Sequence, residues 1–194
     1  QEMTLLEIDQ NLTNILYELT RTDPKLQGIV YLIATYLIFL LPVVLVWLAY
    51  KPMWRNVSLK IFLFTIITWQ LISKNAGEFF YNQYNFRDRP FAFSGLKELL
   101  FEQPQKSFPS DHSAVLLFVT LALFHYRQRT WAWIFLVVTV LSGLSRVSVG
   151  FHWIGDVIGG WIVALIGFGL LVVLEKPLEK MLDLGVKFFK TTKK

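Results

Sequence analysis

Five long apolar runs constrain this chain more than any other feature of its sequence, and they cover residues 29–50, 59–80, 109–126, 131–144 and 154–174. A run of about 20 apolar residues matches the hydrocarbon core of a bilayer when it is helical. Because backbone polar groups in lipid must be satisfied within their own segment, each run has to be a helix. Hydrophobic residues make up 54% of the chain, more than in ordinary soluble proteins. The sequence therefore predicts an all-α, polytopic membrane helical bundle with about five transmembrane helices.

Amphipathic segments flank this apolar core. In residues 1–25, Leu and Ile recur at helical spacing among acidic and amide residues, which predicts a helix on a membrane surface. The alternative for this segment is a packing helix with no role in chemistry. Residues 175–194 are cationic and carry Leu, Met and Phe at helical spacing, which predicts a second surface helix over anionic lipid. We therefore expect one membrane domain over 1–194, with its transmembrane core at 26–174.

The distribution of charge predicts the orientation of the bundle. With five spans, segments 51–60, 126–130 and 175–194 lie on one side, and they hold eleven of the 19 Lys and Arg residues but three of the 14 Asp and Glu residues. By the positive-inside rule this side is cytoplasmic. The net charge of +5 is thus explained by topology, and we expect no nucleic-acid partner. The chain has no cysteine, so disulfides and thiolate metal sites are excluded.

A polar island at residues 145–156 separates the last two apolar runs, and it contains Arg146, His152 and Asp156 at R-x5-H-x3-D spacing. If a helix starts near His152, Asp156 lies one turn further on the same face. Its carboxylate can then reach the imidazole. The pair is a candidate nucleophile and its orienting partner.

Two further polar blocks stand on the same predicted side of the bundle. One is Phe-Pro-Ser-Asp-His at residues 108–112, and the other is Arg-Asp-Arg-Pro at residues 87–90. The guanidinium groups of Arg89 and Arg146 match the oxygens of a phosphate. Ser110 adds a hydroxyl, and N–H groups at the start of the following helix favour an anion. These residue types are therefore suited to binding a phosphate group.

In order and approximate separation, the blocks R-P, P-S-D-H and S-R-x5-H-x3-D resemble those of the type 2 phosphatidic acid phosphatase (PAP2) superfamily. The resemblance covers about residues 26–174 and is specific, because three spaced blocks must coincide. It is strongest to the small bacterial undecaprenyl pyrophosphate phosphatases associated with bacitracin resistance.

The resemblance implies a role for each residue. His152 attacks phosphorus, Asp156 holds the other ring nitrogen, and His112 protonates the departing oxygen. No metal and no cofactor are implied. The superfamily usually has a lysine seven residues before its arginine, where this chain has Asn82, and either Arg87 or Lys74 could supply that charge. The implied phosphate-binding residues are Arg87, Arg89, Arg146, Ser110 and Asp111.

The implied activity is hydrolysis of a lipid phosphate or pyrophosphate through a phosphohistidine. The preferred reaction converts undecaprenyl pyrophosphate to undecaprenyl phosphate on the outer face of a bacterial plasma membrane, which recycles the lipid carrier of peptidoglycan biosynthesis. Substrate and membrane lipids are the expected partners, with no obligate protein partner. The alternatives are a phosphatidylglycerophosphate, phosphatidate or lipid A phosphatase, a lipid-to-lipid phosphotransferase, and a transporter or interaction protein. A further expectation is a short surface helix at residues 94–102, as a cover or a substrate guide.

Overall fold

The computed structural model describes residues 4–84, 86–90 and 106–191, with side chains described as far as residue 180. Helices dominate this part of the chain. Outside them, an isolated backbone bridge pairs Asp88 with Lys106. In chain order the elements are α1 (Leu5–Arg21), α2 (Pro24–Tyr36), the 3-10 helix η1 (Leu37–Phe39), α3 (Leu40–Tyr50), α4 (Arg55–Ile66), the π-helix η2 (Ile67–Ser73), α5 (Lys74–Tyr84), α6 (Asp111–His125), α7 (Arg129–Ser148) and α8 (Ile154–Thr191).

Four helical stretches of the described chain are long and apolar enough to cross a membrane, namely Pro24–Tyr50, Arg55–Tyr84, Arg129–Ser148 and Ile154–Lys180. Helix α6 is apolar but has 15 residues, a length of about 22 Å at the helical rise. That is shorter than the hydrocarbon core of about 30 Å. The predicted all-α membrane bundle is confirmed, while a count of five full crossings stays a prediction.

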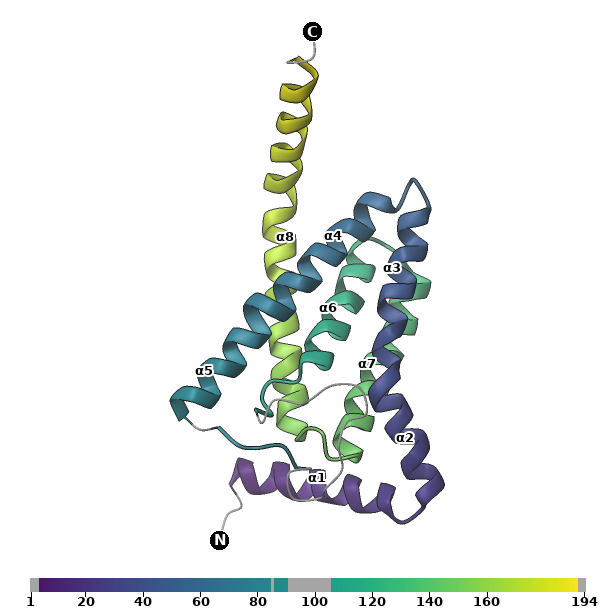
Figure 1. Ribbon diagram of the computed structural model, residues 1–194, viewed down its shortest axis with the longest axis vertical. Coiled ribbons are helices and arrows are strands. Elements are labelled where there is room, and N and C mark those ends of the chain that lie inside the picture. Colours follow the sequence, from purple (N-terminus) through teal and green to yellow (C-terminus); the bar gives the residue numbers. More distant parts are fainter. Residues whose placement is uncertain (1–3, 85, 91–105, 192–194) are drawn as a thin grey trace.

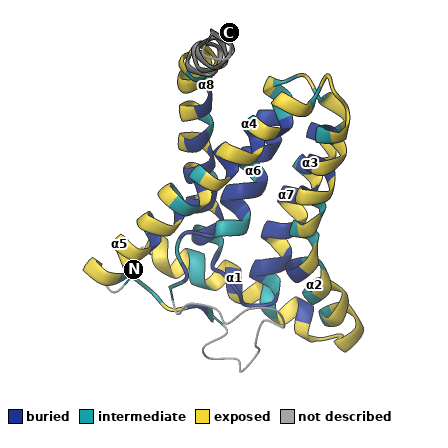
Figure 2. Ribbon diagram, turned by 45° about the horizontal axis from the view of Figure 1, so that its top comes forward, coloured by how far each residue is buried: buried dark blue, intermediate teal, exposed yellow. Residues whose placement is uncertain are grey.

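Helix α6 lies at the centre of the bundle (Figure 1) and packs against both α7 and α8. It is buried on almost every side (Figure 2), and Leu116, Phe118, Val119, Ala122 and Leu123 are fully enclosed. Because α6 is covered by other helices, it does not need the length of a lipid-facing span. Gly160 on α8 permits the close contact, since a Cβ at that position would lie 2.9 Å from the Ser113 Cβ at the start of α6.

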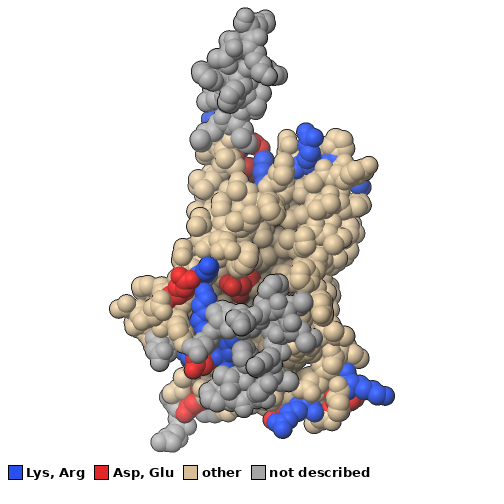
Figure 3. Space-filling model, in the orientation of Figure 1, with Lys and Arg blue, Asp and Glu red and all other residues tan. Residues whose placement is uncertain are grey.

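The outer faces of the long helices carry exposed apolar side chains, such as Val46 on α3, Val137 on α7 and Leu165 on α8. Figure 3 shows a broad band without charged side chains between the charged groups at the two ends of the molecule. Exposed apolar surface of this extent is expected of a protein whose solvent is lipid.

The N-terminal segment forms the predicted amphipathic helix, and α1 lies across the end of the bundle that is opposite the C-terminus (Figure 1). Thr4 and Glu7 form a capping box at its start. Leu5, Leu12 and other large apolar residues of α1 are exposed, whereas the polar Thr13 is buried against the bundle. The helix therefore turns Thr13 and Thr20 to the protein and leaves a row of apolar side chains exposed, which suits a helix at a lipid interface.

The C-terminal segment differs from the prediction, because α8 continues without a break through both the apolar run and residues 175–191. Pro177 lies inside this helix. The residues around it are strong helix formers such as Leu, Glu and Lys, which extend a helix that meets no other break. The segment is thus an extension of α8 and not a separate surface helix. The short helix expected at 94–102 lies outside the described residues.

Candidate active site

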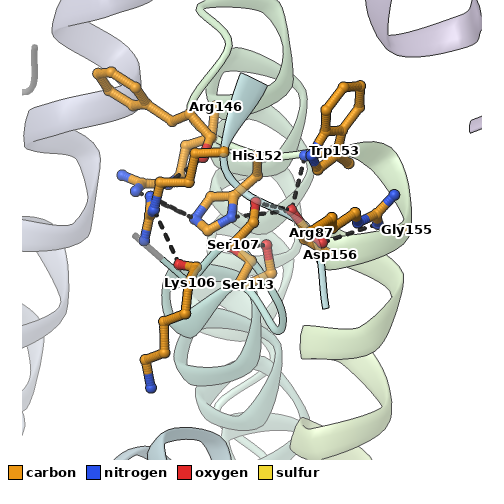
Figure 4. Close-up of polar contacts among 12 residues, drawn as sticks. Arg87, Lys106, Ser107, Ser113, Arg146, His152, Trp153, Gly155 and Asp156 are labelled. Atoms are coloured by element: carbon orange, nitrogen blue, oxygen red, sulfur yellow. Dashed lines mark hydrogen bonds and ion pairs between the residues drawn. The ribbon is translucent and has the colours of Figure 1, made fainter. Parts of the chain in front are cut away.

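The three sequence blocks meet at the end of the bundle covered by α1. Segments 86–90 and 106–110, the turn at 149–153 and the first turns of α6 and α8 converge there (Figures 1 and 4). Arg146, His152 and Asp156 are each at most 1% exposed. The polar residues of the predicted site therefore form a buried cluster at one end of an apolar bundle.

The turn between α7 and α8 positions His152. Val149 caps α7, and Gly150 follows with a φ of 77°, in the left-handed region that glycine adopts without strain. The N–H of Gly150 donates to the Val147 carbonyl (2.9 Å), and the N–H of Phe151 donates to the Arg146 carbonyl (2.9 Å). This pair of bonds is a Schellman motif. It reverses the chain at the end of α7, so that the next residue, His152, faces the bundle interior.

His152 and Asp156 form the predicted pair. The Nδ1 atom of His152 lies 3.4 Å from Oδ2 of Asp156, which is longer than a usual N–H···O hydrogen bond. The same Oδ2 accepts from the backbone N–H of Trp153 (2.9 Å) and from the Ser107 hydroxyl. Asp156 therefore caps the start of α8 while facing the imidazole, and these bonds fix its orientation.

The other nitrogen of His152 faces two arginines. Its Nε2 lies 3.4 Å from Nη1 of Arg89 and 3.4 Å from Nη2 of Arg146. Because guanidinium groups can only donate, Nε2 must be the unprotonated, accepting nitrogen, and the proton belongs on Nδ1 toward Asp156. The lone pair of Nε2 is thus directed between two cations.

Burial holds the pKa of His152 well below its usual range, and the Arg89 and Arg146 guanidinium groups lower it further, while Asp156 opposes the shift. The imidazole is therefore neutral near pH 7. A neutral imidazole with a free lone pair is a competent nucleophile.

Backbone carbonyls hold the two arginines in place. Arg89 donates to the carbonyls of Phe151 (3.2 Å) and Lys106 (3.1 Å), and Arg146 donates to the Ala34 carbonyl of α2 (3.1 Å). The Arg146 guanidinium also lies 5.3 Å from the centre of the Phe151 ring. In Figure 4 the Arg146 and His152 side chains point toward each other. Each arginine is thus preorganised beside Nε2, where an anionic phosphoryl group would be bound.

The start of α6 contributes further groups. Ser110 is its N-cap residue, but its side chain does not cap the helix and instead accepts from the Ser113 hydroxyl at 3.1 Å. The backbone N–H of Ser110 donates to the Asp156 carbonyl (2.9 Å), which joins α6 to α8. The Asp111 carboxylate accepts from the Ser73 hydroxyl of η2 (2.5 Å). The titratable groups near His112 are Arg146, His152 and Arg89, so both motif histidines belong to one cluster.

Arg87 lies on the other side of the pair. Its Nη2 donates to Oδ1 of Asp156 (2.9 Å), and its Nη1 pairs with the carboxylate of Asp9 on α1. The predicted phosphate-binding role of Arg87 finds no support in these contacts, since both ends of its guanidinium face carboxylates. The predicted phosphate-binding role of Arg89 fits its position better, because its guanidinium lies beside Nε2 of His152.

Sequence reasoning missed Asp9, Ser107 and the backbone oxygen of Lys106. Ser107 directly precedes the Phe-Pro-Ser-Asp-His block, and Asp9 stands four residues before Thr13 on one face of α1. This spacing puts both residues on one face of a helix, but Asn14 and Glu18 share it, so the sequence alone did not single out Asp9. Among the residues described, no group of three or more His, Cys, Asp or Glu side chains is arranged to hold a metal ion.

Comparison with known proteins agrees with the fold and the blocks. Residues 58–178 match the PAP2 superfamily. The chain is 33% identical to undecaprenyl-diphosphatase BcrC of Bacillus subtilis (strain 168) over 104 residues, which are 54% of this chain and 53% of that protein. It is 24% identical to the bacitracin transport permease protein BcrC of Bacillus licheniformis over 192 residues, 95% of this chain and 91% of that protein. The matched part thus spans about half of the Bacillus subtilis relative.

A solved structure shows the same fold. The PAP2 type phosphatidylglycerolphosphate phosphatase from Bacillus subtilis superposes with a TM-score of 0.62 at 21% identity, covering 89% of this chain and 87% of that one. The helical bundle is therefore that of a multi-pass membrane protein with a PAP2 phosphatase fold. This chain belongs to the PAP2 superfamily.

Proposed function

We propose that this protein is a membrane lipid phosphatase that works through a phosphohistidine at Nε2 of His152. The observation that carries the proposal is the environment of this ring, with Nδ1 toward the Asp156 carboxylate and Nε2 between Arg89 and Arg146. A phosphoryl group bound by the two guanidinium groups lies next to the lone pair that attacks it.

The reaction has two steps. The Nε2 lone pair forms a bond to the terminal phosphorus, and the bond from that phosphorus to the bridging oxygen breaks. His112, protonated at that moment, gives its proton to the departing oxygen, so the lipid leaves as its phosphate or alcohol. Water then attacks phosphorus, returns a proton to His112 and breaks the N–P bond, which releases inorganic phosphate. Asp156 stabilises the positive charge that the imidazole carries in the intermediate.

The substrate we propose is undecaprenyl diphosphate, converted to undecaprenyl phosphate. Three similar proteins carry this activity in their names: those of Bacillus subtilis and Escherichia coli, the latter described as putative, and that of Sulfolobus acidocaldarius. A similar protein of Escherichia coli, 34% identical over 76 residues, is named a lipid A 1-diphosphate synthase, so phosphate transfer to a lipid is the alternative.

We propose that the site faces the outside of a bacterial plasma membrane. The support is the excess of Lys and Arg in segments 51–60, 126–130 and 175–194. Residues 51–60, 126–130 and the described part of the last segment, 175–191, lie at the end of the bundle away from α1 (Figure 1). The site would then meet substrate in the outer leaflet.

The test is a panel of lipid phosphates and diphosphates offered to the purified protein in detergent, with phosphate release as the measurement and His152→Ala as the control. We expect release from undecaprenyl diphosphate at a rate at least ten times that from phosphatidate or phosphatidylglycerophosphate. Because arginines and helix N–H groups bind the phosphoryl group, a chelator should leave the rate unchanged. Faster release from a lipid with another headgroup would reject undecaprenyl diphosphate as the substrate. Phosphate release that persists in His152→Ala would reject the phosphohistidine mechanism.

A further inference from the structure

Helix α1 reaches the site through its polar face. Oδ1 of Asp9 accepts from the backbone N–H of Gly155 (2.9 Å), and the Thr13 hydroxyl accepts from the N–H of Ile154 (3.2 Å). These N–H groups belong to the first turn of α8 and have no partner within their own helix. The residue before α8 is Trp153, whose indole cannot accept such bonds. Asp156 caps the N–H of Trp153, and helix α1 supplies acceptors for the next two N–H groups of α8.

The same Asp9 side chain is one end of a chain of charges. It pairs with Arg87, which pairs with Asp156, which faces His152. The side chains of Asp9 and Arg87 are each 14% exposed, and that of Asp156 is fully buried. The Arg87 guanidinium also lies over the ring of Phe86 at 5.3 Å. Arg87 is thus enclosed between two carboxylates and held against an aromatic ring.

Gly155 gives independent evidence that this arrangement is built into the fold. A Cβ at that position would lie 2.7 Å from Nη2 of Arg87 and 2.9 Å from Oδ2 of Asp9. Any larger residue there would displace the ion pair. Because Gly155 has no side chain, the first turn of α8 has room for the side chains of Asp9 and Arg87.

The charges explain what Asp9 does for the pair. A cation that touches Asp156 weakens this carboxylate as an acceptor for a positively charged imidazole. Asp9 offsets the charge of Arg87, so that Arg87 can fix Asp156 in position without neutralising it. Removal of Asp9 leaves Arg87 with Asp156 as its remaining carboxylate partner and draws that carboxylate away from His152.

We infer that Asp9 is a positioning residue of the active site, acting through Arg87 on Asp156 and His152. This inference rests on the proposed function and deepens it, because it assigns a role in catalysis to α1, which lies before the matched residues 58–178. Arg87 accordingly acts as a positioning residue and not as a phosphate ligand. The exposed apolar side chains of α1 can rest on the lipid surface, and this holds Asp9 in contact with Arg87.

The test compares Asp9→Asn with Asp9→Glu in the purified full chain. We expect Asp9→Asn to lower kcat about tenfold while KM for undecaprenyl diphosphate changes less than twofold, because the phosphate-binding arginines are intact. Asp9→Glu retains the carboxylate and should recover most of the loss. Gly155→Ala, which keeps every charge but displaces the pair, should behave like Asp9→Asn. This second variant also serves if Asp9→Asn does not fold.

A double-mutant cycle separates positioning from simple stabilisation of the fold. If Asp9 acts through Arg87, then adding Asp9→Asn to Arg87→Gln should lower kcat less than twofold further. The matched control is Glu18→Gln, which removes the same charge from an exposed position of α1 and should leave kcat unchanged.

Two results would overturn the inference: a kcat of Asp9→Asn equal to that of the parent, or a full tenfold loss that persists in the Arg87→Gln background. A parent protein that releases no phosphate from any lipid would instead reject the proposed function, and the positioning role with it.

Discussion

Replacement of Asp156 by Asn tests how the buried carboxylate contributes to catalysis. The carboxylate serves four groups, because Oδ1 accepts from Arg87, and Oδ2 faces Trp153 N–H, Ser107 and His152. An amide has one accepting oxygen. If that oxygen stays toward Trp153 and His152, the cap of α8 survives and the NH2 group opposes Arg87. The variant should therefore fold, with the negative charge beside the imidazole removed.

The size of the effect follows from the distance. A unit negative charge 3.4 Å from a positively charged imidazole stabilises it by about 5 kcal/mol at the effective dielectric constant of 20 that suits protein sites. Loss of this interaction in the transition state corresponds to a fall in kcat of roughly three to four orders of magnitude. KM should stay within a few-fold of the parent value, because Arg89 and Arg146 are untouched.

The assay is rapid-quench measurement of phosphoenzyme formation and phosphate release at saturating undecaprenyl diphosphate, with the melting temperature in detergent as the control for folding. A folded Asp156→Asn protein whose kcat is within tenfold of the parent would refute the electrostatic role. A loss that appears in KM alone would do the same.

Other predictions follow from the same geometry. His112→Ala should lower kcat on the order of a hundredfold, with a smaller loss for a substrate whose leaving group needs no proton; equal losses for both substrates would remove His112 from that step. His152 binds a proton in the unfolded chain with a pKa of about 6.5, but its pKa is lowered in the folded protein, so stability should fall as the pH drops below that value. Between pH 6.5 and 5 the contribution is about 1.5 kcal/mol, and His152→Gln should flatten the pH dependence of unfolding by that amount. Cysteines introduced at the exposed Glu18 of α1 and Thr130 of α7 should react with an impermeant reagent from opposite sides of the membrane, and labelling of both from outside would contradict the topology.

The bundle and the His–Asp pair follow from periodicities that a sequence contains. Apolar runs of membrane length must be helical, and they are. The R-x5-H-x3-D spacing fixes Asp156 one helical turn from the nucleophile, and the structure has Asp156 in the first turn of α8. Local rules suffice for these features because each depends on residues close together in the chain.

Contacts between distant segments could not be predicted in this way. Arg89 and Arg146 come from separate parts of the chain and meet at a single ring nitrogen. The sequence made Arg87 a less secure phosphate-binding residue than Arg89, but it did not show which group each arginine contacts. The two arginines are two residues apart in an extended segment, so their side chains are expected to point the same way. In the structure, however, Arg87 contacts Asp156 and Arg89 contacts His152. The role of Asp9 depends on the packing of α1 across the bundle, which no local pattern specifies.

The central claim is that Nε2 of His152 forms the covalent intermediate. The most direct measurement is rapid-quench trapping of the protein after exposure to undecaprenyl diphosphate labelled in its terminal phosphate, followed by peptide mapping of the acid-labile label. We predict that the label is found on His152, and that His152→Ala carries none. A label on His112, or a labelled phosphohistidine that persists in His152→Ala, would contradict the account.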